Sequence, residues 1–294
     1  MGGNAMSNIL YDLPGPRARA RNLVIGVVTA VAVVAVAVYV VSRFIATDQF
    51  STLRTTQFQY TAVQQELANG LLATLKAAAI ATVLALVFGA VFAAARLSDH
   101  AVIRVPAAWI VELFRAIPLL ILIFFFYYVP LQYKMHLPTL WALVFGLTLY
   151  NGSVLAEIFR AGILAVPRGQ SEAAYAIGLR KSQVMTSVLL PQAVRAMLPA
   201  IVSQLVVLLK DTALGFIITY PELLYVAKQI GGRGSFDFPY VVSYLVVAAI
   251  YIGICGALSA FAYWLQKRMG RSRRTAAKPV PVDQGNASTA GATV

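Results

Sequence analysis

Residues 23–41 read LVIGVVTAVAVVAVAVYVV, a run without one charged side chain. A helix rises about 1.5 Å per residue and the hydrocarbon core of a bilayer is about 30 Å thick, so a spanning helix needs about 20 mostly apolar residues. The run meets that requirement. Arg17, Arg19 and Arg21 precede it, as in a signal peptide, but a signal core is only about 7–15 residues long and a small-residue cleavage site follows it. No clear site of that kind follows here, so we expect residues 23–46 to be a retained transmembrane helix.

Similar runs recur along the chain. Of its 294 residues, 60% are hydrophobic and only 12% are charged, whereas about a quarter of the residues in a soluble domain carry a charge. The charges cluster between the apolar runs. The sequence therefore predicts an all-α, polytopic integral membrane protein with about six transmembrane helices. The further runs are 71–95, 106–133, 137–156, 196–219 and 238–266.

The net charge of +13 does not indicate nucleic-acid binding, because that function needs a basic face on a soluble fold. Lys and Arg instead concentrate in residues 1–22, after the second and fourth runs, and in residues 267–294. Loops rich in Lys and Arg stay on the cytoplasmic side of a membrane. We therefore expect cytoplasmic termini, with 1–22 as an N-terminal tail and 267–294 as a disordered basic tail.

Residues suited to catalysis or metal binding are few. The single cysteine, Cys255, lies in an apolar run, and His100 and His136 lie in separate loops, which leaves no disulfide, no metal-ligand set and no nucleophile–base pair. Lys181-Ser182 has no glycine before the lysine, so it is not a phosphate-binding loop. We expect no catalytic residue, metal or cofactor in this chain.

The most informative loop lies between the fourth and fifth runs. Residues 167–191 read PRGQSEAAYAIGLRKSQVMTSVLLP. Ser171 suits a helix N-cap, with Glu172 favourably placed in the first turn, and Gly178 can end the helix in the left-handed conformation. Ala173 and Ala174 give this short helix a face of small side chains. Such a helix either docks into the groove of a partner or lies against the lipid headgroups.

This loop resembles the EAA loop of permease subunits in ATP-binding-cassette (ABC) importers. The resemblance rests on Glu172-Ala173-Ala174, on Gly178, and on Val188-Leu189-Leu190-Pro191. In that family the short helix is a coupling helix that fits the ATPase subunit. The resemblance thus implies that 167–191 couples to an ATPase through Gly169, Gln170, Glu172, Ala173, Ala174 and Gly178.

Other motifs resemble the polar amino acid uptake branch of that family, and most of all its glutamate permeases. They are Asn69-Gly70, Phe114-Arg115 with Pro118-Leu119, residues 156–160, and Lys210-Asp211-Thr212, although Ala116-Ile117 stands where the branch has Gly-Thr. The resemblance implies a permease domain at 66–266 in the plasma membrane of a prokaryote, surrounded by membrane lipid. It also implies the partners of that domain. These are two cytoplasmic ATPases that bind ATP and Mg²⁺, a homologous permease or a second copy of this chain, and an external substrate-binding protein.

A few ionisable residues fall inside the apolar runs, where a charge is costly and usually faces a bundle interior or a water-filled path. An amino acid substrate carries an ammonium and a carboxylate, so a path through hydrocarbon needs polar groups of both signs. We expect Arg115, Lys210 and Asp211 to line the path, with Glu157 as a less favoured member. The alternative is a structural charge network, because Glu112 with Arg115 and Glu157 with Arg160 are spaced to pair on one helix face.

Two other functions remain open from the residues alone. A self-sufficient, ion-coupled amino acid carrier would show inverted repeats with paired broken helices, and no internal repeat is visible. A membrane scaffold would have no polar path, and replacing Lys210 or Asp211 would then have no effect.

Overall fold

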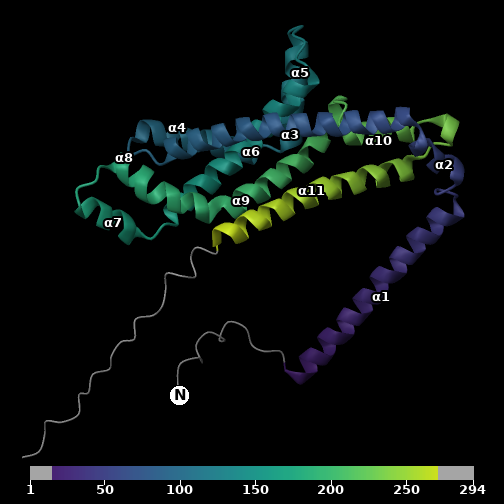
Figure 1. Ribbon diagram of the computed structural model, residues 1–294, viewed down its shortest axis with the longest axis horizontal. Coiled ribbons are helices and arrows are strands. Elements are labelled where there is room, and N and C mark those ends of the chain that lie inside the picture. Colours follow the sequence, from purple (N-terminus) through teal and green to yellow (C-terminus); the bar gives the residue numbers. More distant parts are fainter. Residues whose placement is uncertain (1–14, 271–294) are drawn as a thin grey trace, which may run out of the picture.

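The computed structural model describes residues 15–270, and within this range every regular element is a helix (Figure 1). In chain order the elements are α1 (Pro16–Ala46), α2 (Thr52–Thr56), η1 (Gln57–Gln59), α3 (Thr61–Arg96), α4 (Ala101–Ala116), α5 (Leu119–Gln132), α6 (Thr139–Leu164), α7 (Arg168–Ala176), α8 (Lys181–Gln183), η2 (Val184–Leu189), α9 (Leu190–Asp211), η3 (Thr212–Ile218), α10 (Leu223–Gly231), η4 (Gly234–Phe236) and α11 (Tyr240–Gly270). The all-α prediction is confirmed.

The core lies where α3, α6 and α9 meet. Ala81 and Ala85 on α3 are fully buried, as is Leu155 on α6. A Cβ added to Gly89 would lie only 2.9 Å from the Cβ of Leu155. Helices in a bilayer gain little from the hydrophobic effect, so small residues that allow close backbone approach are what permits tight packing.

Five helical segments are long and apolar enough to cross a membrane, and α4 and α5 together make a sixth that is broken. The sequence predicted residues 106–133 as one continuous span, and this is wrong. Ile117 is extended and the two helices meet at 95°, because a residue that precedes proline, here Pro118, disfavours the helical conformation. The base of α5 packs on α6 through the buried Ile123, while the rest of α5 stands away from the bundle (Figure 1).

The N-terminal helix α1 starts at Pro16 rather than at residue 23, and its apolar window is wholly exposed. It diverges from the bundle, as Figure 1 shows. Arg54 holds its C-terminal end: the guanidinium donates to the carbonyl oxygens of Thr47 and Asp48 and to the carbonyl and carboxylate of Asp237. At the other end of the chain α11 extends to Gly270. The expected tails fall largely outside the described residues.

Candidate functional site

The predicted coupling loop contains α7, which begins directly after Pro167. The sequence predicted Ser171 as the N-cap, and this is wrong: α7 starts at Arg168, and the Ser171 hydroxyl donates to the Arg168 carbonyl at 2.8 Å. Pro167 is the N-cap residue, with ψ 132°, and it separates α7 from the preceding helix because proline disfavours the helical conformation of the residue before it. The predicted end is confirmed, since Gly178 adopts φ +84°.

The surface of α7 exposes apolar side chains. Tyr175 is 49% exposed and Ile177 is 78% exposed, although this helix lies outside the candidate membrane spans. An exposed apolar patch outside the membrane spans suits a contact with a partner protein or with the lipid headgroups. Among the predicted coupling residues Ala174 faces inward and is buried. The others are exposed: Gly169, Gln170, Glu172, Ala173 and Gly178.

An ion pair fastens this loop to the connection between α3 and α4. The Lys181 ammonium contacts the Asp99 carboxylate. The hydrogen bond from Lys181 is the main cause that lowers the pKa of Asp99, and the charge of Lys181 adds to it. The carboxylate therefore stays ionised below its usual range, and the loop and the α3–α4 connection are held together at one end of the bundle.

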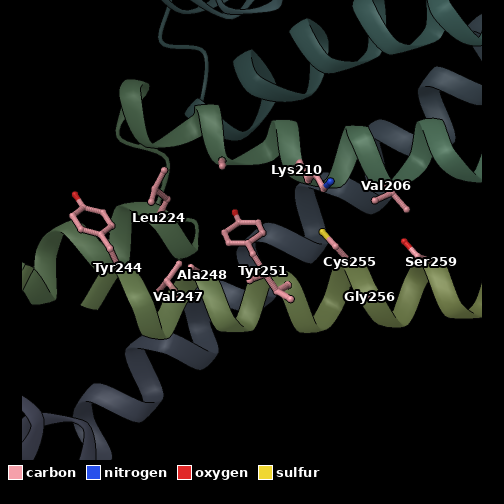
Figure 2. A pocket seen from close by; sticks show the side chains of 12 residues that line it. Val206, Lys210, Leu224, Tyr244, Val247, Ala248, Tyr251, Cys255, Gly256 and Ser259 are labelled. Atoms are coloured by element: carbon pink, nitrogen blue, oxygen red, sulfur yellow. The ribbon is translucent and has the colours of Figure 1, made fainter. Parts of the chain in front are cut away.

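A groove of about 730 Å³ runs between α9 and α11. Figure 2 shows Lys210 reaching into it from α9 and Tyr251 from α11. The Lys210 ammonium makes no hydrogen bond or ion pair with any residue in the described part of the chain. Most of the other lining residues are apolar, among them Val206 and Val247. The groove thus presents an unpaired cation on an apolar wall, an arrangement that suits an anionic ligand group.

Behind Tyr251 lies a buried carboxylate that the sequence analysis missed. Glu222 has no exposed surface. It caps α10, accepting hydrogen bonds from the backbone N–H groups of Leu224 (2.8 Å) and Tyr225 (2.7 Å), and it also accepts one from the Tyr251 hydroxyl at 2.8 Å. The sequence contained a signal: Pro221-Glu222 precedes the apolar pattern of residues 223–230, which is typical of a helix start.

Asp211 points away from the Lys210 groove. Its carboxylate accepts from the Asn151 amide at 3.4 Å, and the Asn151 oxygen accepts from Gln204 at 2.7 Å. Asn151 is fully buried. Consecutive helix residues lie about 100° apart, so the two charges serve different faces of α9. Asp211 belongs to a polar link between α6 and α9 that the sequence did not reveal.

The remaining two predicted path residues lie in a charge network that joins α3, α4 and α6. Arg96 pairs with Glu157 at 3.0 Å and with Glu112 at 3.3 Å. Arg160 pairs with Glu157, and Arg115 with Glu112 at 3.4 Å. The expected path residues therefore occupy three places: this network, the groove and the α6–α9 link. That they line one path remains a prediction.

Comparison with known proteins gives the context of these features. The profile of a family described as "Binding-protein-dependent transport system inner membrane component" matches residues 85–271. A glutamate transport system permease protein of Corynebacterium glutamicum is 45% identical over 224 residues, which cover 74% of this chain and 81% of that protein. A glutamate/aspartate import permease protein of Escherichia coli is 34% identical and covers 69% of this chain and 92% of its own length.

Solved structures agree with the sequence matches. The crystal structure of an amino acid ABC transporter with histidines is similar at a TM-score of 0.66 with 30% identity, covering 72% of this chain and 97% of the other. The inward-facing methionine ABC transporter, at 19% identity and a TM-score of 0.57, covers 72% of this chain and 98% of the other. At that identity the likeness shows the fold alone.

Proposed function

Since the chain belongs to the family of binding-protein-dependent transport system inner membrane components, it is the permease subunit of an ABC importer, and we propose that this importer carries a polar amino acid, with glutamate as the first candidate. The observation that carries this choice of substrate is the 45% identity with a glutamate permease over most of both chains. The permease is the transport subunit of an inner-membrane importer and works with ATPase and binding-protein partners.

The proposed assembly contains two cytoplasmic ATPases that bind ATP and Mg²⁺, one external binding protein, and a homologous permease or a second copy of this chain. Both termini and α7 face the cytoplasm in this proposal. The exposed Tyr175 and Ile177 beside Glu172 and Ala173 support α7 as the ATPase contact. ATP binding closes the ATPases and moves α7. Because Lys181 in α8, five residues after α7 in the same loop, pairs with Asp99 between α3 and α4, that motion reaches the membrane helices.

The substrate path includes the groove between α9 and α11. Lys210 is the group in it that recognises a carboxylate, because its ammonium has no protein partner among residues 15–270. Arg115, Asp211 and Glu157 remain proposed members of the path. Each of these has at least one polar partner within the chain, so their replacement tests assembly as much as transport.

The test is uptake by the whole importer reconstituted in liposomes with its ATPase and binding protein. Wild-type complexes should accumulate L-glutamate only when ATP is present, and competition by aspartate, glutamine and histidine ranks the alternatives. Lys210→Ala should slow uptake at least about tenfold, the factor for one lost charge-assisted hydrogen bond, and size-exclusion chromatography should show intact complexes.

Three results would contradict parts of this proposal. ATP-independent uptake by this chain alone, driven by an ion gradient, would favour a secondary carrier. Uptake of another amino acid but not glutamate would change the substrate. Normal uptake by a well-assembled Lys210→Ala complex would remove the groove from the path.

A further inference from the structure

A second cavity, of about 330 Å³, lies between α3 and α10 and shares no lining residue with the Lys210 groove. Its polar lining residues are Glu66, Asn69, Tyr225, Gln229 and Arg233. The volume falls at the lower end of the range for small-molecule sites, about 300–1,000 Å³. Figure 1 shows α10 toward the α2 end of the bundle, opposite α7, and the cavity lies at that end because α10 contributes to its lining. In the proposed orientation this is the side on which the binding protein delivers its cargo.

Two residues that line this cavity, Glu66 and Arg233, form an ion pair. One terminal nitrogen of Arg233 donates to both Glu66 oxygens, at 2.7 and 2.5 Å. The Nε and the other terminal nitrogen of Arg233 donate to nothing within residues 15–270. The Nε–H and the other terminal nitrogen can each still donate a hydrogen bond to an anion, but as separate donors, because both two-nitrogen edges of the guanidinium include the nitrogen that Glu66 occupies.

The ion pair between Arg54 and Asp237, at the same end of the bundle, provides a comparison with an arginine whose contacts are all structural. Arg54 uses all three of its nitrogens, on three carbonyl oxygens and one carboxylate. Its side chain is 12% exposed, against 29% for Arg233. None of the five cavities described in this structure has Arg54 in its lining. Arg233 is therefore left with hydrogen-bonding capacity that the loop contact does not use.

The neighbouring side chains in the cavity also have hydrogen-bond donors or acceptors that no residue in the described chain uses. The Tyr225 hydroxyl accepts from the Gln229 amide at 2.7 Å, and its own proton has no acceptor in the described chain. The Asn69 side chain has no hydrogen bond there either. Each Glu66 oxygen accepts from one nitrogen only, and a carboxylate oxygen can accept more than one hydrogen bond. Donors for an anion and an acceptor for a cation thus meet in one cavity.

We propose that the α3–α10 cavity is an outer binding site for the α-amino and α-carboxylate groups of a free amino acid. A free N–H of Arg233 and the Tyr225 hydroxyl hold the carboxylate, and Glu66 holds the ammonium. The Glu66–Arg233 ion pair stays intact, because Arg233 binds the ligand with N–H groups, and Glu66 with acceptor sites, that the ion pair does not use. The proposal rests on the proposed function, since the ligand is the same class of substrate, and it adds a site before the Lys210 groove.

The test measures the binding of L-glutamate to the permease–ATPase complex in lipid nanodiscs without binding protein. Saturation-transfer NMR suits it because such a site releases its ligand quickly. All variants carry Lys210→Ala, which removes the groove as a competing site. Two analogues separate the charges: glutarate lacks the ammonium, and γ-aminobutyrate lacks the α-carboxylate.

The parent complex should bind L-glutamate at least about tenfold more tightly than either analogue, the factor for one charge-assisted hydrogen bond. Arg233→Gln should abolish the preference over γ-aminobutyrate. Glu66→Gln should abolish the preference over glutarate. Asp237→Asn, the matched control, neutralises the carboxylate of the other outer pair and should change neither ratio.

A purely structural ion pair gives a different pattern. Arg233→Gln and Glu66→Gln would then weaken all three ligands alike, leave both ratios unchanged, and overturn the proposal. Loss of all glutamate binding on Lys210→Ala would also overturn it, while wild-type uptake would still uphold the proposed function. Failure of the wild-type importer to take up any amino acid would overturn both.

Discussion

Replacing Tyr251 with phenylalanine tests the buried polar link between α10 and α11. The hydroxyl donates at 2.8 Å to Glu222, which has no exposed surface. Phenylalanine keeps the ring and removes this hydrogen bond together with the hydroxyl's interactions with the side chains of Thr74 and Thr212. A hydrogen bond to a charged group contributes about 1.5–3 kcal/mol, and this value applies well above pH 7, because burial raises the pKa of Glu222 to about 7. In a domain of this size each kcal/mol shifts the melting temperature by about 2–4 °C, so a loss of about 2 kcal/mol lowers it by about 4–8 °C.

Thermal unfolding of the purified full chain, at one pH and in one detergent, measures the effect. The matched control is Tyr244→Phe, because Tyr244 lines the same groove from α11 and its hydroxyl makes no hydrogen bond in the described part of the chain. A surface change of that kind stays within about 0.5 kcal/mol, which corresponds to a shift of about 1–2 °C.

A second background shows whether Glu222 is the partner that matters. Glu222→Ser keeps a side chain that caps helices well but is too short to reach Tyr251. In this background Tyr251→Phe should lose about 2 kcal/mol less than in the wild type, which is the coupling energy, because only the interactions with Thr74 and Thr212 remain to be lost. Equal losses in both backgrounds, or a Tyr251→Phe effect as small as that of Tyr244→Phe, would refute the reasoning.

Three further predictions concern the loop, the core and the orientation. Gly178→Val should make the permease lose its ATPase on co-purification, because φ +84° costs a β-branched residue about 1–3 kcal/mol. Gly169→Ala, in equally open space, should keep the ATPase bound. ATPase retention by both variants would contradict the coupling role. Gly89→Val should overpack the α3–α6 contact, cost about 1–3 kcal/mol and lower the melting temperature by several degrees. Gly253→Ala, whose added Cβ meets no atom within 4 Å, should leave the melting temperature unchanged. Equal melting temperatures for the two variants would argue against tight packing at Gly89. In a cysteine-free background an impermeant thiol reagent should label Ser51→Cys but not Gly169→Cys from outside intact cells, and the reverse pattern would invert the proposed orientation.

The sequence by itself determined the fold class, the approximate spans and the short helix in the loop of residues 167–191. These follow from local chemistry: in hydrocarbon the backbone must satisfy its own hydrogen bonds, so an uncharged run such as residues 23–41 forms a helix whatever its neighbours are. The left-handed end of α7 is equally local, because Gly178 lacks the Cβ that disfavours that conformation. The break at Pro118 was also readable, since the restriction on the preceding residue is local, but the uniform hydropathy of residues 106–133 concealed it.

Only the tertiary structure decided which side chains meet. Lys210 and Asp211 are adjacent in the chain but serve different faces of α9, and the side to which each belongs depends on where α6 and α11 pack. Glu222 reaches Tyr251 across 29 residues of sequence, and Arg233 reaches Glu66 across 167. Hydropathy measures how a segment prefers lipid to water and carries no information about its rotation or its neighbours. The buried carboxylate and the α3–α10 cavity exist because separate helices bring their polar groups together.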